Sequence, residues 1–467
     1  MLRQLLRFLR RLIFHAWRAV RWTIGLFLFL MLIQYSSFPL GLRWNAVAVM
    51  TSDHQFDYLA WEIDAIASKA AQVLWGVQPY MSEEDRSQTV RDYMADMALA
   101  QDLENQVNAV FSDPNVSDAQ AASADLRAER DSLRADLRSR QPLMEAILEG
   151  QVAAVLVDEG FGVAGQLIPP IAMHFTQVPN LLIVSPRDQI RFEVSINLDP
   201  MPIDEIAALE DRIDTAQDVS TLIVPLGGIA LYPAMILETS NLRWAIETFS
   251  HEWSHHYFFM YPLGLSYDFM GEARIINETV ADLFGKEIAQ SVMARYYPEL
   301  VTQAENVTVG TQNRVSAQQQ TPDFDFGYAM NQTRMKVDHY MAHIAAMERK
   351  RDLAEIAGSI AITDAYTAIT DGLIDEVEAY MEARREIFYA NGYQIRKLNQ
   401  AYFAFYGGYQ GGIAGIGGED PIGPAVRDIR AMSPTIHDWI VTLRSITSRD
   451  ELIQVRDAME AEQQEEF

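Results

Sequence analysis

The chain has 467 residues, more than one compact core accommodates, so the sequence predicts two or three domains. Hydrophobic residues make up 49% and aromatic residues 10% of the chain, which excludes disorder throughout. The formal net charge is −27, and residues 1–43 contain seven arginines and no acid, so the rest carries about −34. Phosphates would repel such an acidic body, which argues against a nucleic-acid partner. The absence of cysteine excludes disulfides, thiolate catalysis and Cys-ligated zinc.

The N-terminal region predicts attachment to membrane lipid. Residues 22–42 (WTIGLFLFLMLIQYSSFPLGL) carry no charge and approach the ~20 residues needed to cross the hydrocarbon core. Arginines cluster before this span, which predicts a cytoplasmic N-terminus and an extracytoplasmic body. Residues 1–21 are expected to form a basic amphipathic segment on the inner leaflet, or a helix that continues into the span. The sequence therefore predicts a single-pass membrane protein.

Two alternatives to this topology stay open. The tripeptide AVA at 46–48 resembles the cleavage site of a signal peptide. It lies well beyond the main apolar stretch at 24–33, and the basic region before that stretch is unusually long, so an uncleaved anchor is the favoured interpretation. A body that faces the cytoplasm would require the charge bias to mislead.

Residues 44–150 predict a helical hairpin. Apolar residues at three-to-four spacing indicate a helix over 56–111, and FSDPNVSD at 111–118 is a cluster of turn residues. Acidic and basic residues alternate over 123–140, which is typical of a solvent-exposed helix. The pair is expected either to form a stalk or to pack against the main body.

The remaining chain predicts an α+β fold, with a mixed-sheet lobe at 151–300 and a mostly α-helical C-terminal lobe at 301–467. In the first lobe, strand patterns precede two helices at 241–261 and about 272–296. The expected strands cover 180–187, 190–198, 220–226 and 229–238, with a helix at 202–217. Residues 301–325 are polar and predict a linker or loop. The glycine-rich run 407–420 lacks GxGxxG spacing and predicts a mobile connection.

Residues 251–255 read HEWSH, an HExxH motif. Each residue of an α-helix rotates by about 100°, so positions four apart lie within about 40° of each other. His251 and His255 can therefore reach one metal ion from one face, and Glu252 lies beside the open position, where a base is needed. His256 points about 100° away from His255 and is expected to be structural. The simpler interpretation is an aromatic core helix whose histidines only form hydrogen bonds.

A catalytic zinc needs a third protein ligand and an open position for water. The extended motif HExxHxxGxxH is excluded, because the chain has Phe258 and Tyr261 where Gly and His are required. The following helix contains INETVADLFGKEI, in which Glu278 can complete a His₂Glu site. Asp282, one turn later, can accept a hydrogen bond from a ligand imidazole and fix its tautomer. Gly285 continues this face and would let two antiparallel helices approach closely.

HEWSH followed by NETVAD resembles the gluzincin metallopeptidases, the thermolysin-like clan, over about 240–290. In this family HExxH lies on one helix and a glutamate, commonly in an ExxxD context, on the next. The resemblance strengthens the assignment of the metal ligands of a Zn²⁺ site: His251, His255 and Glu278. It also implies that Asp282 orients His251. Glu252 would take a proton from the attacking water and pass it to the leaving amine.

The resemblance extends more loosely to 382–409, which is similar to the C-terminal part of predicted bacterial aminopeptidases of this clan. Members of the family stabilise the oxyanion with a Tyr or His from the helical lobe, and the candidates are Tyr402, Tyr406 and His343, with Tyr402 preferred. The run GGIALYPAM at 227–235 fits the edge strand on which gluzincins pair extended substrates, or it is an interior strand.

The sequence therefore predicts a membrane-anchored zinc peptidase that acts on peptides or proteins outside the cytoplasm. Whether it is an aminopeptidase or an endopeptidase stays open, and Glu272 is available to hold a substrate ammonium group. The alternative is a catalytically inactive, anchored binding or scaffold protein that keeps a gluzincin fold. The presence of Glu252 between the two histidines argues for the enzyme.

Overall fold

A computed structural model describes residues 14–15, 17–18, 20–27, 29, 42–112, 118–301, 324–411 and 416–465. The chain divides into two compact units, Met1–Met50 and Thr51–Phe467. In the first unit, helix α2 spans Arg43–Met50. Most of the predicted span at 22–42 and most of the predicted linker at 301–325 lie outside the described residues. Within the part of the chain that is described, no helix has both the length and the apolarity to cross a membrane.

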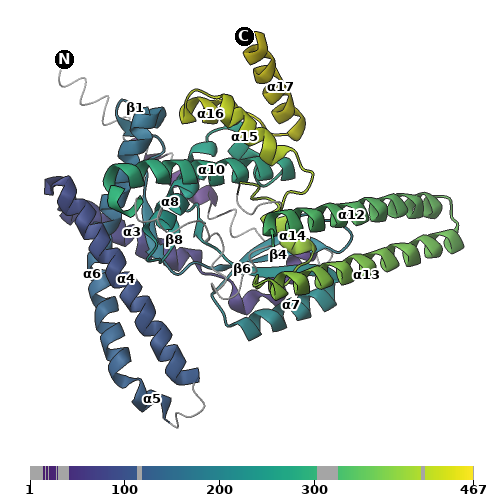
Figure 1. Ribbon diagram of the computed structural model, residues 1–467, viewed down its shortest axis with the longest axis horizontal. Coiled ribbons are helices and arrows are strands. Elements are labelled where there is room, and N and C mark those ends of the chain that lie inside the picture. Colours follow the sequence, from purple (N-terminus) through teal and green to yellow (C-terminus); the bar gives the residue numbers. More distant parts are fainter. Residues whose placement is uncertain are drawn as a thin grey trace. The chain divides into compact units, whose positions relative to one another are not determined.

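The second unit is an α+β fold in which helices predominate and the sheets are small, which confirms the expected fold class (Figure 1). Strands β3 (Met173–Thr176), β7 (Gly228–Ile229) and β8 (Ala234–Leu237) form one sheet in the order β3-β8-β7. β3 runs parallel to β8, and β7 runs antiparallel to it. β7 pairs with β8 alone and is therefore an edge strand of this sheet.

A second sheet is fully antiparallel and has the order β5-β4-β6. Its central strand β4 (Asn180–Pro186) is buried along its whole length between β5 (Val194–Leu198) and β6 (Val219–Pro225). Helix α7 (Ile203–Gln217) connects β5 to β6 and packs on β6. The sequence treated all these strands as one mixed-sheet lobe, whereas the structure divides them between two sheets, with a further two-stranded hairpin of β1 (Gly162–Val163) and β2 (Gln166–Leu167).

The helical hairpin exists, but its first arm differs from the single helix expected over 56–111. Helix α3 (Tyr58–Trp75) ends before Gly76, and α4 (Glu83–Ser112) begins after a turn that contains Pro79. Gly76 adopts an extended backbone and Pro79 lacks a donor N–H, so the helix is interrupted there. α4 packs against α6 (Ala124–Leu156), with the short helix α5 (Ala119–Ala122) near the turn between them (Figure 1).

The hairpin packs against the main body over part of its length. Met97 of α4 and Met144 of α6 are buried in the same core cluster as Phe249 and Phe284 of the helices that carry the HExxH and NETVAD motifs. The acid-base alternation at 123–140 occupies the mostly exposed first half of α6. The hairpin therefore projects into solvent at the end near its turn and packs against the main body at the other end.

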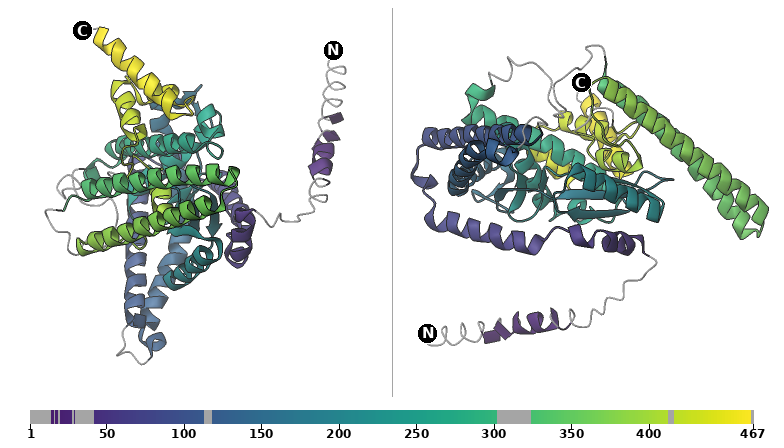
Figure 2. Two further views of the ribbon diagram at one scale, coloured as in Figure 1. Left: turned by 90° about the vertical axis from the view of Figure 1, so that its right-hand side faces the viewer. Right: turned by 90° about the horizontal axis from the view of Figure 1, so that it is seen from below.

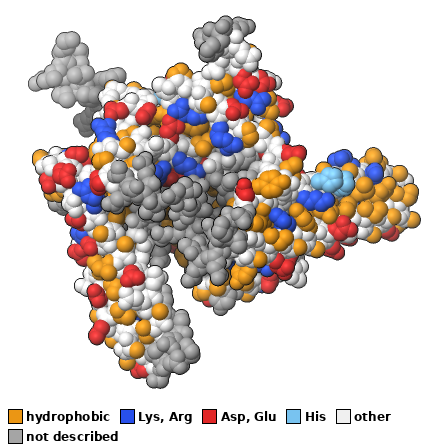
Figure 3. Space-filling model, viewed as in Figure 1, with side chains coloured by type: hydrophobic (Ala, Val, Ile, Leu, Met, Phe, Trp, Pro, Cys, Tyr) orange, Lys and Arg blue, Asp and Glu red, His pale blue; other side chains and the backbone are white. Residues whose placement is uncertain are grey.

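The C-terminal region contributes to two separate cores. Helices α12 (Phe326–Ile356) and α13 (Ile360–Ala390) lie side by side in both views of Figure 2 and share a cluster with β4, β6 and α14 (Gln400–Tyr406). Exposed apolar side chains gather at the turn between α12 and α13, namely Leu353, Ile356 and Ile360 (Figure 3). The remaining helices return to the first cluster: α15 (Ile422–Met432) packs against α10, and α16 (Ile436–Leu443) and α17 (Arg449–Glu465) pack against α15.

Candidate metal centre

Helix α8 (Leu242–Phe258) carries the HExxH motif. Asn241 caps it, because its side-chain oxygen accepts a hydrogen bond from the Trp244 amide at 3.1 Å. The helix ends at Phe258, three residues before the end expected for the helix at 241–261, and Pro262 starts a separate short helix, α9 (Pro262–Leu265). Proline suits the first turn of a helix, where its missing N–H costs no hydrogen bond.

The aromatic residues of the motif region hold α8 in the core. Phe249 and Trp253 are almost completely buried, and the Trp253 indole N–H donates to the Pro169 carbonyl at 3.1 Å. His251 and His255 lie on a different face and remain partly exposed. One face of α8 therefore packs its aromatic residues in the core, while another face presents the two histidines.

Helix α10 (Gly271–Tyr296) runs antiparallel to α8, as expected from the reversal between the two helices. Asn277 near its start contacts His255, and Gly285 near its middle faces Glu247. A Cβ on Gly285 would lie 2.6 Å from the Glu247 carbonyl oxygen and 3.3 Å from the His251 amide nitrogen. The lack of a side chain at Gly285 therefore allows the backbones of the two helices to approach closely, as predicted.

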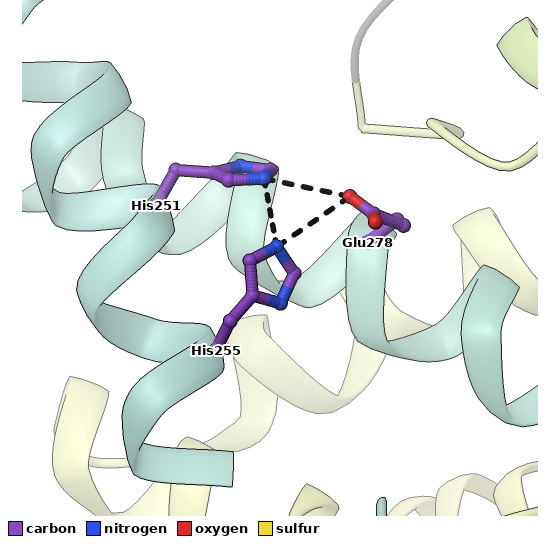
Figure 4. A group of neighbouring side chains, drawn as sticks. All are labelled: His251, His255 and Glu278. Carbon is purple, nitrogen blue, oxygen red and sulfur yellow. Dashed lines mark hydrogen bonds and ion pairs between the residues drawn. The ribbon is translucent and has the colours of Figure 1, made fainter. Parts of the chain in front are cut away.

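Three side chains from α8 and α10 converge on one point (Figure 4). The Nε2 atoms of His251 and His255 are 3.1 Å apart, and Glu278 Oε2 lies 3.4 Å from the first and 3.7 Å from the second. The three ligand atoms all lie within 4.8 Å of one another. Separations of this size let a single ion with bonds of about 2 Å contact all three atoms after small side-chain adjustments.

The imidazole of His255 is oriented by Asn277. The Nδ1 atom of His255 lies 2.8 Å from Asn277 Oδ1, so a proton on Nδ1 donates to this oxygen. Nε2 of His255 is then unprotonated and directs its lone pair toward His251 and Glu278. Asn277 is buried and directly precedes Glu278, but nothing in its spacing distinguishes it from a surface residue of α10, so the sequence does not indicate this role.

Glu278 has one oxygen occupied and one available. The hydroxyl of Tyr267 donates to Oε1 of Glu278, and Oε2, which is buried, receives no hydrogen bond from any residue that the structure describes. A buried carboxylate oxygen without a donor is costly unless a cation compensates it. Two imidazole nitrogens and this oxygen match the His₂Glu donor set of catalytic zinc, so the residues present fit the ion.

The charges of the cluster are strongly coupled. Burial by itself would raise the pKa of Glu278, but the neighbouring His255 and His251 outweigh it and lower the pKa to about 2. Burial lowers the pKa of His255, whereas the charges of Glu278 and Glu252 raise that of His251 despite its burial. The cluster thus holds an ionised Glu278, a neutral His255 and a His251 whose pKa is raised to about 9, so a bound metal would displace the proton of His251.

Glu252 lies where the site meets the edge strand β7. Its side chain is 6% exposed, and burial raises the pKa of its carboxyl to about 7. A Cβ on Gly228 of β7 would lie 2.6 Å from Glu252 Oε1, so the backbone of the edge strand passes directly beside this carboxylate. A carboxylate that exchanges protons near neutral pH, next to a half-buried edge strand, is suited to general acid–base catalysis on an extended chain.

The other predicted site residues lie in different surroundings. Asp282 follows Glu278 by one turn of α10, and its Oδ2 lies 3.3 Å from Lys286 Nζ, while its charge acts on His251 at longer range. Tyr402 is buried in the second core cluster, where its ring lies 4.6 Å from that of Tyr406. The imidazole of His256 packs edge-on against Tyr232, on a face away from the metal cluster.

The glycine-rich run contributes to the site, which the sequence did not indicate. Tyr409 stacks on the ring of His251 with centroids 6.4 Å apart, and the Gly411 carbonyl accepts a hydrogen bond from Lys286 at 2.7 Å. Gly411 also lies against α10, where a Cβ would be 3.1 Å from Asp282 Oδ2. The only hint in the sequence was the loose similarity of 382–409 to predicted aminopeptidases.

The chain as a whole was compared with protein-family models, curated proteins and solved structures, and none of them matches it. The candidate centre therefore rests on two kinds of observation. One is the HExxH and NETVAD spacing in the sequence, and the other is the convergence of His251, His255 and Glu278 in the structure. Both describe a His₂Glu cluster that could hold a metal ion, beside a buried carboxylate.

Proposed function

We propose that this protein is a zinc-dependent peptidase whose centre consists of His251, His255 and Glu278, with Glu252 as the general base. The observation that carries the proposal is the convergence of two Nε2 atoms and one carboxylate oxygen that receives no hydrogen bond, next to the buried Glu252. Structural zinc sites are filled by four protein ligands, whereas three ligands leave a position for substrate and water. The donor set therefore favours a catalytic role.

The residues of the chain would divide the chemistry between them. Zinc bound by the three ligands would lower the pKa of a water molecule and polarise the scissile carbonyl. Glu252 accepts a proton from the attacking water and returns it to the leaving amine. Asn277 and Tyr267 hold His255 and Glu278 in the ligating orientation through their hydrogen bonds. Tyr402 remains a candidate for oxyanion stabilisation from its resemblance to the family alone.

The edge strand β7 supports a peptide as the substrate. An extended chain can add to a sheet by pairing with an unpaired strand edge. Gly228 places this edge against Glu252, so a peptide paired there would pass directly over the base. The segment 22–42 would anchor the enzyme in a membrane with the body outside the cytoplasm, a proposal that rests on its uncharged sequence and the preceding arginines.

The test is hydrolysis of a pool of random peptides by the full-length chain reconstituted with zinc, read by mass spectrometry. Glu252→Gln should retain zinc and lose activity by about 10²- to 10⁴-fold, the usual contribution of a general base. Glu287→Gln is the matched control, because Glu287 lies on α10 and pairs with Arg430 at the periphery of the fold.

The outcomes separate the enzyme from the scaffold. Cleavage by the wild type and the control, but not by Glu252→Gln, supports the peptidase. Stoichiometric zinc in all three proteins with no cleavage of any peptide would favour an inactive binding or scaffold protein instead. A Glu252→Gln variant as active as the wild type would remove Glu252 from the mechanism.

A further inference from the structure

We propose that Arg274 forms a carboxylate-binding subsite beside the metal centre, so that the preferred substrates carry a carboxylate near the scissile bond. The inference rests on the proposed function and assigns it a substrate class. Arg274 lies on α10 one turn before the ligand Glu278, and residues four apart on a helix are surface neighbours about 5 to 6 Å apart at Cβ. The guanidinium is thus adjacent to the position where a substrate would bind.

Aromatic rings fix the guanidinium. Its Cζ lies 3.5 Å from the ring centroid of Phe192 and 5.2 Å from that of Tyr267. Tyr267 is also the donor to Glu278, so the same ring contacts both the cation and a metal ligand. A planar guanidinium held against two rings keeps its N–H groups along its edges, where they can bind a carboxylate through two parallel hydrogen bonds.

The same aromatic residues connect Arg274 to the opposite side of the centre. Phe192 contacts Phe405 with centroids 6.5 Å apart, Phe405 contacts Tyr409 at 5.1 Å, and Tyr409 stacks on His251. One continuous series of aromatic contacts therefore links Arg274 to the metal ligands. This series joins residues of both core clusters, since α10 belongs to the first and Phe405 to the second.

Arg274 differs from several other partly buried arginines in its charge pairing. Arg187, Arg396 and Arg430 each contact a carboxylate within 3 Å. Among the residues that the structure describes, Arg274 is half-buried and forms no ion pair within 4.0 Å, as is also true of Arg384 and Arg444. Unlike those two, Arg274 lies near the metal ligand Glu278, whose charge acts on it from beyond contact distance. A half-buried guanidinium beside the centre, with no carboxylate in direct contact, can accept the carboxylate of a bound substrate.

The acidic residue near the centre that could hold a substrate ammonium group, Glu272, already has a partner. Glu272, which the sequence offered as a ligand for a substrate ammonium group, accepts a hydrogen bond from the Arg449 amide at 3.0 Å and lies 3.8 Å from its guanidinium. Glu272 is therefore occupied, whereas the Arg274 guanidinium has no carboxylate in direct contact. The guanidinium fits a peptide α-carboxylate or an acidic side chain better than an N-terminal ammonium group.

A structural role for Arg274 makes different predictions. If Arg274 only balanced the charge of Glu278, its loss would weaken zinc binding and affect every substrate equally. If it binds substrate, its loss removes discrimination between peptides with and without a carboxylate and leaves the neutral peptides unaffected. The distinction lies in the ratio between substrates, which global destabilisation does not change.

The experiment uses three pools of N-acetylated random pentapeptides built without acidic residues except as stated. The first pool ends in a free carboxylate, the second in an amide, and the third ends in an amide but contains one glutamate. Equilibrium dialysis with zinc-loaded, full-length Glu252→Gln protein measures binding without turnover, and wild type measures kcat/KM. The test variants are Arg274→Gln and Arg274→Lys. The matched control is Arg295→Gln on the same helix, because Arg295 forms an ion pair with Asp158 away from the metal centre.

We expect the first or the third pool to bind about 10- to 100-fold more tightly than the second, the range for a hydrogen bond to a charged group. Arg274→Gln should abolish this preference without changing binding of the second pool, Arg274→Lys should retain part of it, and Arg295→Gln all of it. Preference for the first pool identifies the α-carboxylate, and preference for the third an acidic side chain. Equal binding of the three pools, no binding, or equal losses for all pools in Arg274→Gln would overturn the inference.

The result is separable from the proposed function. Arg274-dependent binding without hydrolysis by the wild type would leave the subsite in place and remove the peptidase. Hydrolysis by the wild type without any preference for carboxylate peptides would do the reverse.

Discussion

At the scale of single residues, helical spacing determines which ligands can be predicted and which supporting residues cannot. His251, His255 and Glu278 follow from the positions of donor residues on two consecutive helices. Asn277 and Tyr267 act through tertiary hydrogen bonds, which no local pattern encodes. The orientation of the ligands is therefore a property of the folded chain, while their identity is a property of the motif.

Tyr267→Phe tests the orienting role directly. The substitution removes the hydroxyl that donates to Glu278 Oε1 and leaves the ring against Arg274. Supporting partners of metal ligands contribute about 10- to 100-fold in affinity, so zinc binding measured against a competing chelator should weaken by that factor. Tyr328→Phe, at an exposed position on α12, is the control. Unchanged zinc affinity in Tyr267→Phe would contradict the role.

At the scale of elements, the contact between α8 and α10 depends on Gly285. The sequence indicated this position because it continues the face of Glu278 and Asp282, and the structure places it against the backbone of α8. The interruption between α3 and α4 was the opposite case. Gly76 and Pro79 are visible in the sequence, yet the apolar periodicity on both sides suggested a continuous helix.

Gly285→Ala should destabilise the protein by about 1 to 3 kcal/mol, because the added methyl overlaps the Glu247 carbonyl and forces the helices apart. The loss should be visible in chemical unfolding and should be accompanied by weaker zinc binding. The control is Gly150→Ala on α6, where a Cβ meets no atom within 4 Å and the substitution should be neutral or stabilising. Equal effects of the two substitutions would exclude close helix packing as the cause.

A buried network joins α3, α6 and β3. Lys69 Nζ lies 2.7 Å from Glu145 and 2.7 Å from Glu149, and His174 of β3 lies 3.1 Å from Glu145. Burial by itself would raise the pKa of Glu145, but Lys69 and His174 outweigh it and lower the pKa to about 2. Burial raises the pKa of Glu149, and Lys69 compensates only in part. The two carboxyls thus change the free energy of unfolding with pH in opposite directions.

Glu145→Gln should flatten the acid end of the stability curve. A carboxyl with a lowered folded pKa stabilises above its unfolded pKa of about 4.5, and this contribution is lost as pH falls toward 2. The free energy of unfolding of the wild type should therefore exceed that of the variant most at pH 6, with a difference that shrinks by pH 3. Glu149→Gln should change the slope in the opposite sense. The same slope in all three proteins would contradict the assignment.

At the scale of the whole molecule, composition and patterning predicted the α+β class but not the partition of the chain. The boundary expected near residue 300 would place everything after it in one helical lobe. Instead, α12–α14 pack with the antiparallel sheet, while α15–α17 return to the first core cluster, where α15 packs against α10. Which core a helix joins depends on which apolar faces fit each other. Amphipathic periodicity shows only that a helix has an apolar face, and this face could pack on either core cluster.

The account depends on one claim, that the three converging side chains bind a zinc ion. The most direct test is the metal content of the purified full-length chain, measured by mass spectrometry for the wild type, Glu278→Gln, His251→Ala and the control Glu287→Gln. The account predicts about one zinc per chain in the wild type and the control, and loss of zinc in the two ligand variants at the same fold content. A wild type without zinc, or zinc retained in Glu278→Gln and His251→Ala, would contradict it.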